Sequence, residues 1–153
     1  AKGKKWAKYE PTRGIQLISF ERQMPLLLEE CKQYLQNAKK DKDLVPFFSA
    51  INKSDSTAPA GCGSNLMIIC RHCNQNGPEG AARAFLQAPP VSIVVCANRV
   101  HSFDEVKSCL KHELTHAFDM CSQKLDLFRC QELAYSEIRA ARNVECDWYN
   151  HTP

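Results

Sequence analysis

The stretch His112-Glu113-Leu114-Thr115-His116 decides the fold and the chemistry of this chain. In an α-helix, positions four apart differ by about 40° around the axis and by about one turn in height. His112 and His116 therefore project side by side, and both can bind one Zn²⁺ at about 2.1 Å. Glu113 is turned by about 100° around the axis. Its carboxylate then lies beside the metal without being a ligand, where it can accept a proton from water.

The residues around this motif predict a buried helix. Ser102 and Glu105 form an S-x-x-E capping box, so the helix is expected to begin at Phe103 or Asp104 and to end near Met120. Its apolar band consists of Val106, Leu110, Leu114, Ala117, Phe118 and Cys121. H-E-x-x-H also arises by chance, as two surface histidines with an incidental glutamate. Because burying these polar groups without partners is costly, the apolar band favours a metal site.

A third ligand is expected, because a catalytic zinc usually has three protein ligands and one open position. The best candidate is Glu137, in a helix predicted over residues 130–144. Its neighbours on one face are small or apolar: Leu133, Ala140, Ala141 and Val144. A carboxylate on such a stripe needs a partner, either the metal or Arg139, Arg142 or a backbone donor. Asp119 is the rival, as a ligand or as an acceptor that orients a histidine.

The rest of the chain predicts further helices and two strands. Residues 24–40 form an amphipathic helix with Pro25 in its first turn, and a short helix begins at Pro46. Residues 52–65 read as a loop. Apolar runs at 66–70 and 92–97 are typical of strands, whereas the intervening segment 74–90 has no clear pattern. Helices around a small sheet indicate the α+β class, with the H-E-x-x-H helix central.

Length and composition are those of an ordinary globular chain. Its 153 residues are 44% hydrophobic and 24% charged, which predicts a single domain over residues 14–153. No apolar run approaches the ~20 residues that span a bilayer, so any membrane contact is expected to be peripheral. A start at Ala1 suggests a processed or incomplete amino terminus. Residues 1–13 hold five basic residues and one glutamate, which indicates a solvated basic tail and no nucleic-acid partner.

Nine cysteines are dispersed along the chain. Dispersal favours disulfides over a compact zinc cluster, and the odd number leaves at least one cysteine without an internal partner. Cys70-Arg71-His72-Cys73 is a lone C-x-x-C, which is weak evidence for zinc, so its cysteines are expected to pair elsewhere. Cys109, one turn before His112, is an extra ligand or, as we favour, a buried core thiol. His101 and His151 are expected to be ordinary surface residues.

From Cys70 to Asp147 the chain resembles the mitochondrial inner-membrane metallopeptidases that process the ATP synthase subunit 6 precursor and help to assemble that enzyme. The resemblance rests on four blocks: Cys70-Arg71-His72-Cys73-Asn74, Ile93-Val94-Val95-Cys96-Ala97-Asn98, His112 to Cys121 (HELTHAFDMC), and Ser136 to Ala141 (SEIRAA) followed by Cys146-Asp147. Blocks of this length are far more specific than H-E-x-x-H alone.

The resemblance implies a zincin-like fold, a place in the intermembrane space peripheral to the inner membrane, and cysteines oxidised to disulfides. It implies that His112, His116 and Glu137 bind Zn²⁺ and that Glu113 is the catalytic base. The implied partners are a protein substrate or the subunits of a mitochondrial membrane complex.

Some features depart from the family. The family continues well beyond the position of Cys146, whereas this sequence stops at Pro153, and Tyr135 stands where the family has a cysteine. Two hypotheses follow. One is a zinc endopeptidase that processes an inner-membrane precursor and aids ATP synthase assembly. The alternative is a peptidase-derived structural subunit or assembly factor of a large respiratory or ATP synthase complex.

Overall fold

Three short strands form the sheet on which the helices pack. In the computed structural model, which describes residues 24–146, these are β1 (Met67–Arg71), β2 (Ala84–Gln87) and β3 (Ser92–Cys96). β3 is the middle strand and is parallel to β1 and antiparallel to β2. All of β3 is buried, as expected of an apolar run at the centre of a sheet.

Both predicted strands are confirmed to within one residue at each end, but β2 was not predicted. It lies inside the segment 74–90, for which the sequence shows no clear pattern. A strand of four residues carries too little periodicity to be recognised alone. Its place is decided by pairing with β3, where Phe85 lies opposite Val94 and Leu86 opposite Ile93.

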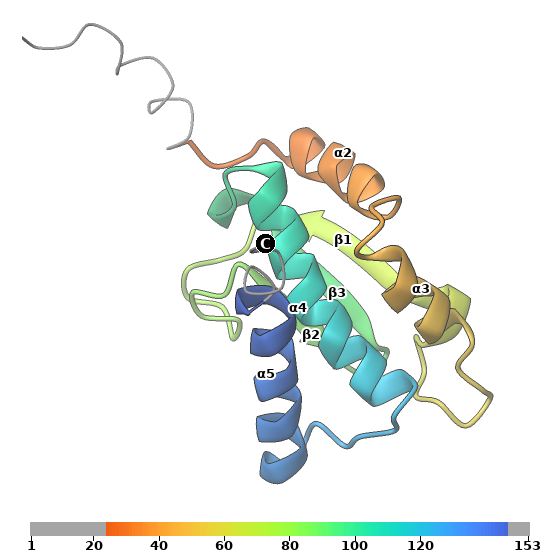
Figure 1. Cartoon of the computed structure of the whole chain (residues 1–153). Coiled ribbons are helices and arrows are strands. Elements are labelled where there is room, and N and C mark those ends of the chain that lie inside the picture. The colour runs from red at the N-terminus through yellow and green to blue at the C-terminus, as the bar shows by residue number, and fades with distance from the viewer. Residues whose placement is uncertain (1–23, 147–153) are drawn as a thin grey trace, which may run out of the picture.

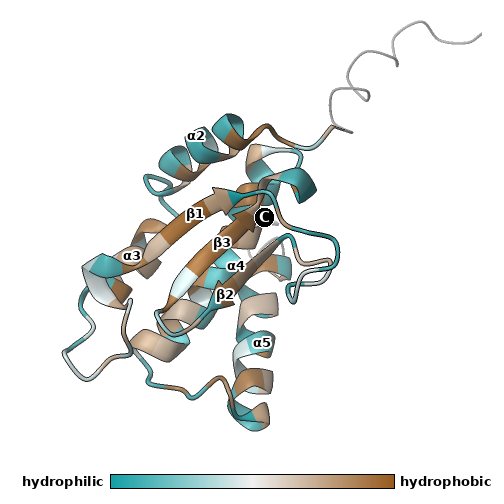
Figure 2. Ribbon diagram, turned by 180° about the vertical axis from the view of Figure 1, so that it is seen from behind, coloured by the Kyte–Doolittle hydropathy of each residue, from teal (hydrophilic) through white to brown (hydrophobic). Residues whose placement is uncertain are grey.

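The helices cover one face of this sheet. Among the described residues they are α2 (Leu28–Ala38), α3 (Val45–Asn52), α4 (Phe103–Cys121) and α5 (Cys130–Glu145). α4 crosses the sheet next to α2 and α3, and α5 packs along α4 (Figure 1). Figure 2 shows the opposite face of the sheet, over which no helix of residues 24–146 lies. The α+β class is confirmed.

Two short 3-10 turns flank the strands, η1 (Gly63–Asn65) before β1 and η2 (Ala97–Arg99) after β3. η1 lies within the predicted loop 52–65. The main core lies between the sheet and the helices. Its largest fully buried apolar side chains include Leu44, Ile51, Ile93, Leu110 and Leu114.

The boundaries of α2 correct one prediction. The helix begins at Leu28, so Pro25 precedes it and does not lie in its first turn. The backbone before the helix is engaged elsewhere, because the amide of Leu26 donates to the carbonyl of Val100 at 2.9 Å. The amide of Leu27 donates to the Glu30 carboxylate at 2.9 Å, which satisfies one of the free amides at the helix start.

The other helices begin and end close to their predicted limits. α3 begins at Val45, one residue before Pro46, and proline suits this first turn because it lacks an amide hydrogen. α4 begins at Phe103, and the Ser102 hydroxyl accepts a hydrogen bond from the Glu105 amide at 3.2 Å. The predicted capping box is only half present. The Glu105 carboxylate accepts from the amide of His101, at 2.9 Å, instead of that of Ser102.

Three disulfides connect helices, strands and loops that are distant in the sequence, which confirms the expectation that cysteines pair. Cys31–Cys70 joins α2 to β1, Cys62–Cys121 joins the loop before β1 to the end of α4, and Cys73–Cys96 joins the loop after β1 to β3. Both cysteines of the C-x-x-C segment are therefore in disulfides. Cys109, Cys130 and Cys146 are free thiols.

Two further expectations concern exposure and the chain ends. Cys109 packs against the core, as expected, but it is only partly buried. The basic tail over residues 1–13, and His151, lie outside the described residues. Within residues 24–146, no helix combines the length and the apolar character needed to cross a membrane.

Candidate metal centre

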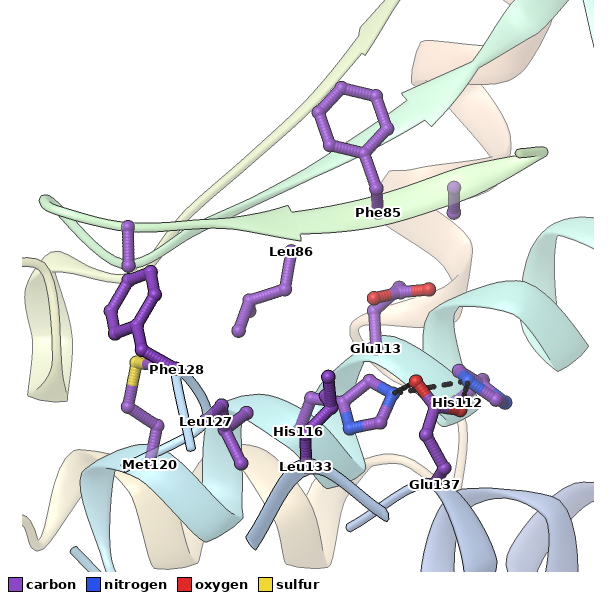
Figure 3. Close-up of a pocket in the computed structure, with 12 residues that line it drawn as sticks. Phe85, Leu86, His112, Glu113, His116, Met120, Leu127, Phe128, Leu133 and Glu137 are labelled. Carbon is purple, nitrogen blue, oxygen red and sulfur yellow. Dashed lines mark hydrogen bonds and ion pairs between the residues drawn. The ribbon is translucent and has the colours of Figure 1, made fainter. Parts of the chain in front are cut away.

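Three side chains from two helices converge at one point on the molecule. α4 supplies His112 and His116, and α5 supplies Glu137 (Figure 3). The Nε2 atoms of the two histidines lie 3.1 Å apart. The Glu137 carboxylate places one oxygen 3.4 Å from each Nε2. These are the only residues of the described chain that form such a group of three potential metal ligands.

Helix geometry explains how the three meet. His112 and His116 are one turn apart on α4, and their rings lie 4.8 Å apart, inclined by 76°. α5 runs along α4, so the side chain of Glu137 reaches the histidines from the neighbouring helix. A contribution from each helix makes the cluster depend on tertiary packing as well as on the motif.

The spacing of these atoms fits a tetrahedral metal ion. Ligand atoms about 2.1 Å from a tetrahedral Zn²⁺ lie about 3.4 Å from one another. The separations of 3.1 Å between the two Nε2 atoms, and of 3.4 Å from each Nε2 to its nearer Glu137 oxygen, are close to that value. Two imidazoles and one carboxylate are also a donor set that catalytic zinc sites use, with one position open for a further ligand. The residues present therefore fit the ion.

Glu137 was predicted as a metal ligand for a reason that the structure contradicts, although its carboxylate does lie next to both histidines. Burial on an apolar stripe predicted a carboxylate in need of a partner, but the side chain is 52% exposed. Of its predicted stripe only Ala140 is fully buried, and Leu133 is 40% exposed. α5 packs on α4 through a narrower face than the periodicity suggests, and Glu137 lies at the rim of that face.

Asp119, the rival ligand, does not join the cluster. It is fully buried, and its carboxylate accepts a hydrogen bond from Ser136 at 2.8 Å and another from Arg139. The Ser136 hydroxyl in turn lies 2.7 Å from Nδ1 of His116. Burial raises the pKa of Asp119 above its ordinary value, although the hydrogen bonds from Ser136 and Arg139 partly oppose this shift. Arg139, the sequence-predicted alternative partner of Glu137, is thus engaged with Asp119.

The surroundings of His116 favour the neutral imidazole, which is the form that binds a metal ion. Its side chain is only 7% exposed. Burial lowers the pKa of the imidazole, because the charged form loses hydration, although the negative charge of Glu137 acts in the opposite direction. A neutral imidazole has one unprotonated ring nitrogen with which to bind a cation.

Glu113 lies beside the cluster, under the edge strand β2. Its side chain is buried between α4 and β2 (Figure 3). Burial raises the pKa of its carboxyl to about 7, and the negative charge of Glu137 contributes to the same shift. A cation bound at the cluster would act in the opposite direction, because a positive charge favours the ionised carboxylate.

An open cavity of about 350 Å³ gives access to these groups. One side of the cavity carries the polar cluster and Glu113, and the other is apolar. Its apolar lining comes from β2 and from the connection between α4 and α5: Ala84, Phe85, Leu86, Ala88, Met120, Leu127, Phe128 and Leu133. Leu86 points from β2 toward the histidines, whereas Phe85 lies on the other side of the strand (Figure 3).

A second cavity of about 370 Å³ adjoins the first. The two share Ala88, Met120 and Phe128 in their linings, so they lie side by side near the end of α4. Beyond the shared residues the lining becomes more polar, with Thr57, Lys124 and Asp126.

Sequence reasoning missed two parts of this site. Ser136 was noted only as part of the block Ser136 to Ala141 that resembles the family. Nothing in its helical spacing indicates contact with a histidine of another helix. Phe85 and Leu86 belonged to the segment without a clear pattern, where a short apolar pair before Pro89 was the one available signal. His101, expected to be an ordinary surface residue, is partly exposed and lies 3.3 Å from the Glu105 carboxylate.

The fold and the site together define a class of protein. An H-E-x-x-H helix lies between a small mixed sheet and a helix that carries a third candidate ligand, which is the arrangement of the zincin-like α+β class. The chain belongs to the Peptidase M76 family, whose model matches residues 29–152.

Several mitochondrial inner membrane proteases are similar to this chain. The ATP23 homolog of Homo sapiens is 36% identical over 100 residues, 63% of this chain and 39% of that protein. The ATP23 homolog of Danio rerio is 29% identical over 144 residues, which cover 92% of this chain and 54% of that protein. ATP23 of Malassezia globosa is 26% identical over 134 residues, which cover 77% of this chain and 52% of that protein. This chain thus spans about half or less of these relatives. No solved structure matches it.

Proposed function

We propose that this chain is a zinc-dependent endopeptidase, with His112, His116 and Glu137 as metal ligands and Glu113 as general base. The observation that carries the proposal is the placement of these four groups. The three candidate ligand atoms lie within 4.8 Å of one another, and Glu113 lies beside them in an open cavity. Membership of a peptidase family supports the same conclusion.

Each group has a defined task in peptide hydrolysis. When bound, Zn²⁺ supplies Lewis-acid polarisation of the scissile carbonyl and lowers the pKa of the attacking water. Glu113 accepts a proton from that water at its carboxylate and passes it to the nitrogen of the leaving amine. Its position under β2 and next to His112 keeps the carboxylate near the cluster but out of the ligand set.

The two cavities and the edge strand beside them support a protein substrate. β2 is an edge strand, since in the described sheet it pairs only with β3. An extended peptide can add to such an edge through backbone hydrogen bonds, with its side chains entering pockets on alternate sides. The apolar lining around Leu86, Leu127 and Leu133 suits a large apolar side chain next to the scissile bond.

The proposed place of action is the mitochondrial intermembrane space, peripheral to the inner membrane, where the substrate is an inner-membrane precursor. The names of the relatives, which are mitochondrial inner membrane proteases, support this place. The three disulfides are compatible with an oxidising compartment. A contribution to ATP synthase assembly, as the sequence resemblance implies, is part of the same proposal.

The test compares the wild type with Glu113→Gln, both loaded with Zn²⁺ and incubated with a precursor peptide. We expect the variant to lose roughly 10²–10⁴-fold in cleavage rate, because an amide cannot act as a base, while its zinc content stays unchanged. Glu145→Gln is the matched control, since Glu145 is exposed at the end of α5. Equal cleavage by wild type and Glu113→Gln would contradict the proposed role.

An assembly factor or structural subunit is the second candidate function. It is favoured by large apolar side chains exposed on and just before α5, where Phe128 is 77%, Tyr135 55% and Ile138 70% exposed. Such exposed groups can bind another protein. Stoichiometric co-migration with a large mitochondrial complex would support this function, whereas purification as a free monomer would argue against it.

A further inference from the structure

A chain of hydrogen bonds leads from the candidate metal centre into the interior between α4 and α5. Nδ1 of His116 lies 2.7 Å from the hydroxyl of Ser136. That hydroxyl donates to Oδ2 of Asp119 at 2.8 Å, and Arg139 donates to Oδ1 of the same carboxylate. Ser136 and Asp119 are fully buried. Water therefore has little access to this chain of contacts.

The number of hydrogens decides the direction of each bond. The Arg139 guanidinium is always protonated and can only donate, and its charge beside Asp119 opposes the effect of burial and favours the carboxylate form. A carboxylate only accepts. The single hydrogen of the Ser136 hydroxyl is therefore used toward Asp119, which leaves the oxygen to accept from the histidine.

The consequence for His116 is a defined tautomer. A neutral imidazole carries one hydrogen, and the bond to Ser136 requires it on Nδ1. Nε2 then presents its lone pair to the point where His112 and Glu137 meet. We propose that Ser136 and Asp119 are positioning residues that hold His116 with Nδ1 protonated and Nε2 free for a divalent cation. This inference rests on the metal site of the proposed function.

His112 has no comparable support. Among residues 24–146 no hydrogen-bond partner lies at its Nδ1, and its side chain is 31% exposed. The two histidines of the motif are thus unequal. His116 is oriented by the packing of α5 before any ion binds, whereas the orientation of His112 depends mainly on α4.

The test measures Zn²⁺ affinity by competition with a chromophoric chelator. Ser136→Ala removes the acceptor at Nδ1. Asp119→Asn allows the new amide to donate to Ser136, which reverses the direction of the bonds. We expect each variant to bind Zn²⁺ roughly 10–100-fold more weakly, the usual cost of losing an outer hydrogen-bond partner of a ligand.

The matched control is Asn143→Ala. Asn143 donates to the Thr115 hydroxyl at 3.1 Å, so this variant also loses one hydrogen bond between α5 and α4, but not one that reaches a histidine. We expect its Zn²⁺ affinity to equal that of the wild type. Comparable losses of affinity in Asn143→Ala and Ser136→Ala would show that helix packing alone is responsible and would overturn the proposal.

A second measurement needs no variant. Nitrogen chemical shifts of the imidazole in metal-free wild-type protein report which ring nitrogen of His116 carries the hydrogen. Protonation at Nδ1 supports the proposal, and protonation at Nε2 overturns it. Zn²⁺ affinity within about twofold of the wild type in both Ser136→Ala and Asp119→Asn would also overturn it. If the wild type binds no Zn²⁺, the proposed function is contradicted. The tautomer of His116 in the metal-free protein still tests the proposed direction of the hydrogen bonds.

Discussion

The two histidines of the motif differ in their surroundings, although they lie on one turn of α4. His116 is 7% exposed and contacts Ser136, whereas His112 is 31% exposed. Glu137 is the most exposed of the three candidate ligands. The site is therefore anchored at His116 and becomes progressively more accessible toward His112 and Glu137.

The role of Glu137 can be tested by removing its charge. We expect Glu137→Gln to weaken Zn²⁺ binding by more than the roughly 10–100-fold caused by loss of an outer hydrogen-bond partner, because one of three ligands is altered. Chelator competition measures this affinity. The fold should be unaffected, since the side chain is 52% exposed.

Glu145→Gln is again the control, because Glu145 lies on α5 outside the cluster. Wild-type affinity in Glu137→Gln, together with complete loss of binding in Asp119→Asn, would show that Asp119 is the third ligand.

At the scale of single residues, the sequence predicted which side chains meet better than it predicted why they meet. The positions of His112 and His116 follow from helix periodicity, which is local. The contact between Ser136 and His116 does not, because it depends on how closely α5 approaches α4. Glu137 was selected by an expectation of burial that the structure contradicts.

The elements that carry the site are held in place by contacts between helices. α4 is joined to the turn between α2 and α3 by Lys107, whose ammonium lies 2.9 Å from the Asp41 carboxylate and 2.7 Å from that of Asp43. These hydrogen bonds to Lys107 lower the pKa of both aspartates in the folded protein. The two carboxylates thus link the turn between α2 and α3 to α4.

A pH-dependent loss of stability is expected when this link is removed. Groups whose folded-state pKa is lowered contribute stability above their unfolded pKa of about 3.9, and this contribution is lost as pH falls through the folded pKa. Lys107→Met should therefore be less stable than the wild type near neutral pH, and the difference should shrink as pH falls below about 4. Urea denaturation at several pH values measures it.

Lys32→Met is the control for this prediction. Lys32 pairs with Glu29 within α2, at 2.7 Å, and both side chains are largely exposed. Such a pair within one helix contributes little. A difference between Lys107→Met and the wild type that stays constant down to strongly acidic pH would contradict the proposed role of Asp41 and Asp43.

Element boundaries illustrate what local sequence can predict. α4 and α5 lie within one residue of their predicted limits, because capping and apolar periodicity act over a single turn. β2 was missed because its four residues become a strand only through pairing with β3. That omission mattered for the site, since β2 forms one wall of the cavity.

For the whole molecule, the disulfides are expected to supply much of the stability. Cys62–Cys121 closes the longest loop of the three, with a sequence separation of 59, and ties the end of α4 to the segment before the sheet. Replacing both cysteines by serine should cost about 2–5 kcal/mol in the free energy of unfolding. Thermal and urea denaturation measure the loss.

The double variant Cys130→Ser/Cys146→Ser is the matched control, because both thiols are free and exposed. It should unfold at the same temperature as the wild type. A similar loss of stability in both double variants would show that the disulfide itself is not responsible.

The sequence by itself determined the H-E-x-x-H helix, the α+β class, the expectation of disulfides and the family. The first three follow from local periodicity, composition and motif spacing, and the family follows from the resemblance of four longer sequence blocks. Only the tertiary structure decided which cysteines pair and that β2 lines the cavity. It also decided that Ser136 contacts His116 and donates a hydrogen bond to Asp119. The physical reason is that these contacts join residues far apart in the chain, so they depend on how α5, α4 and the sheet pack together.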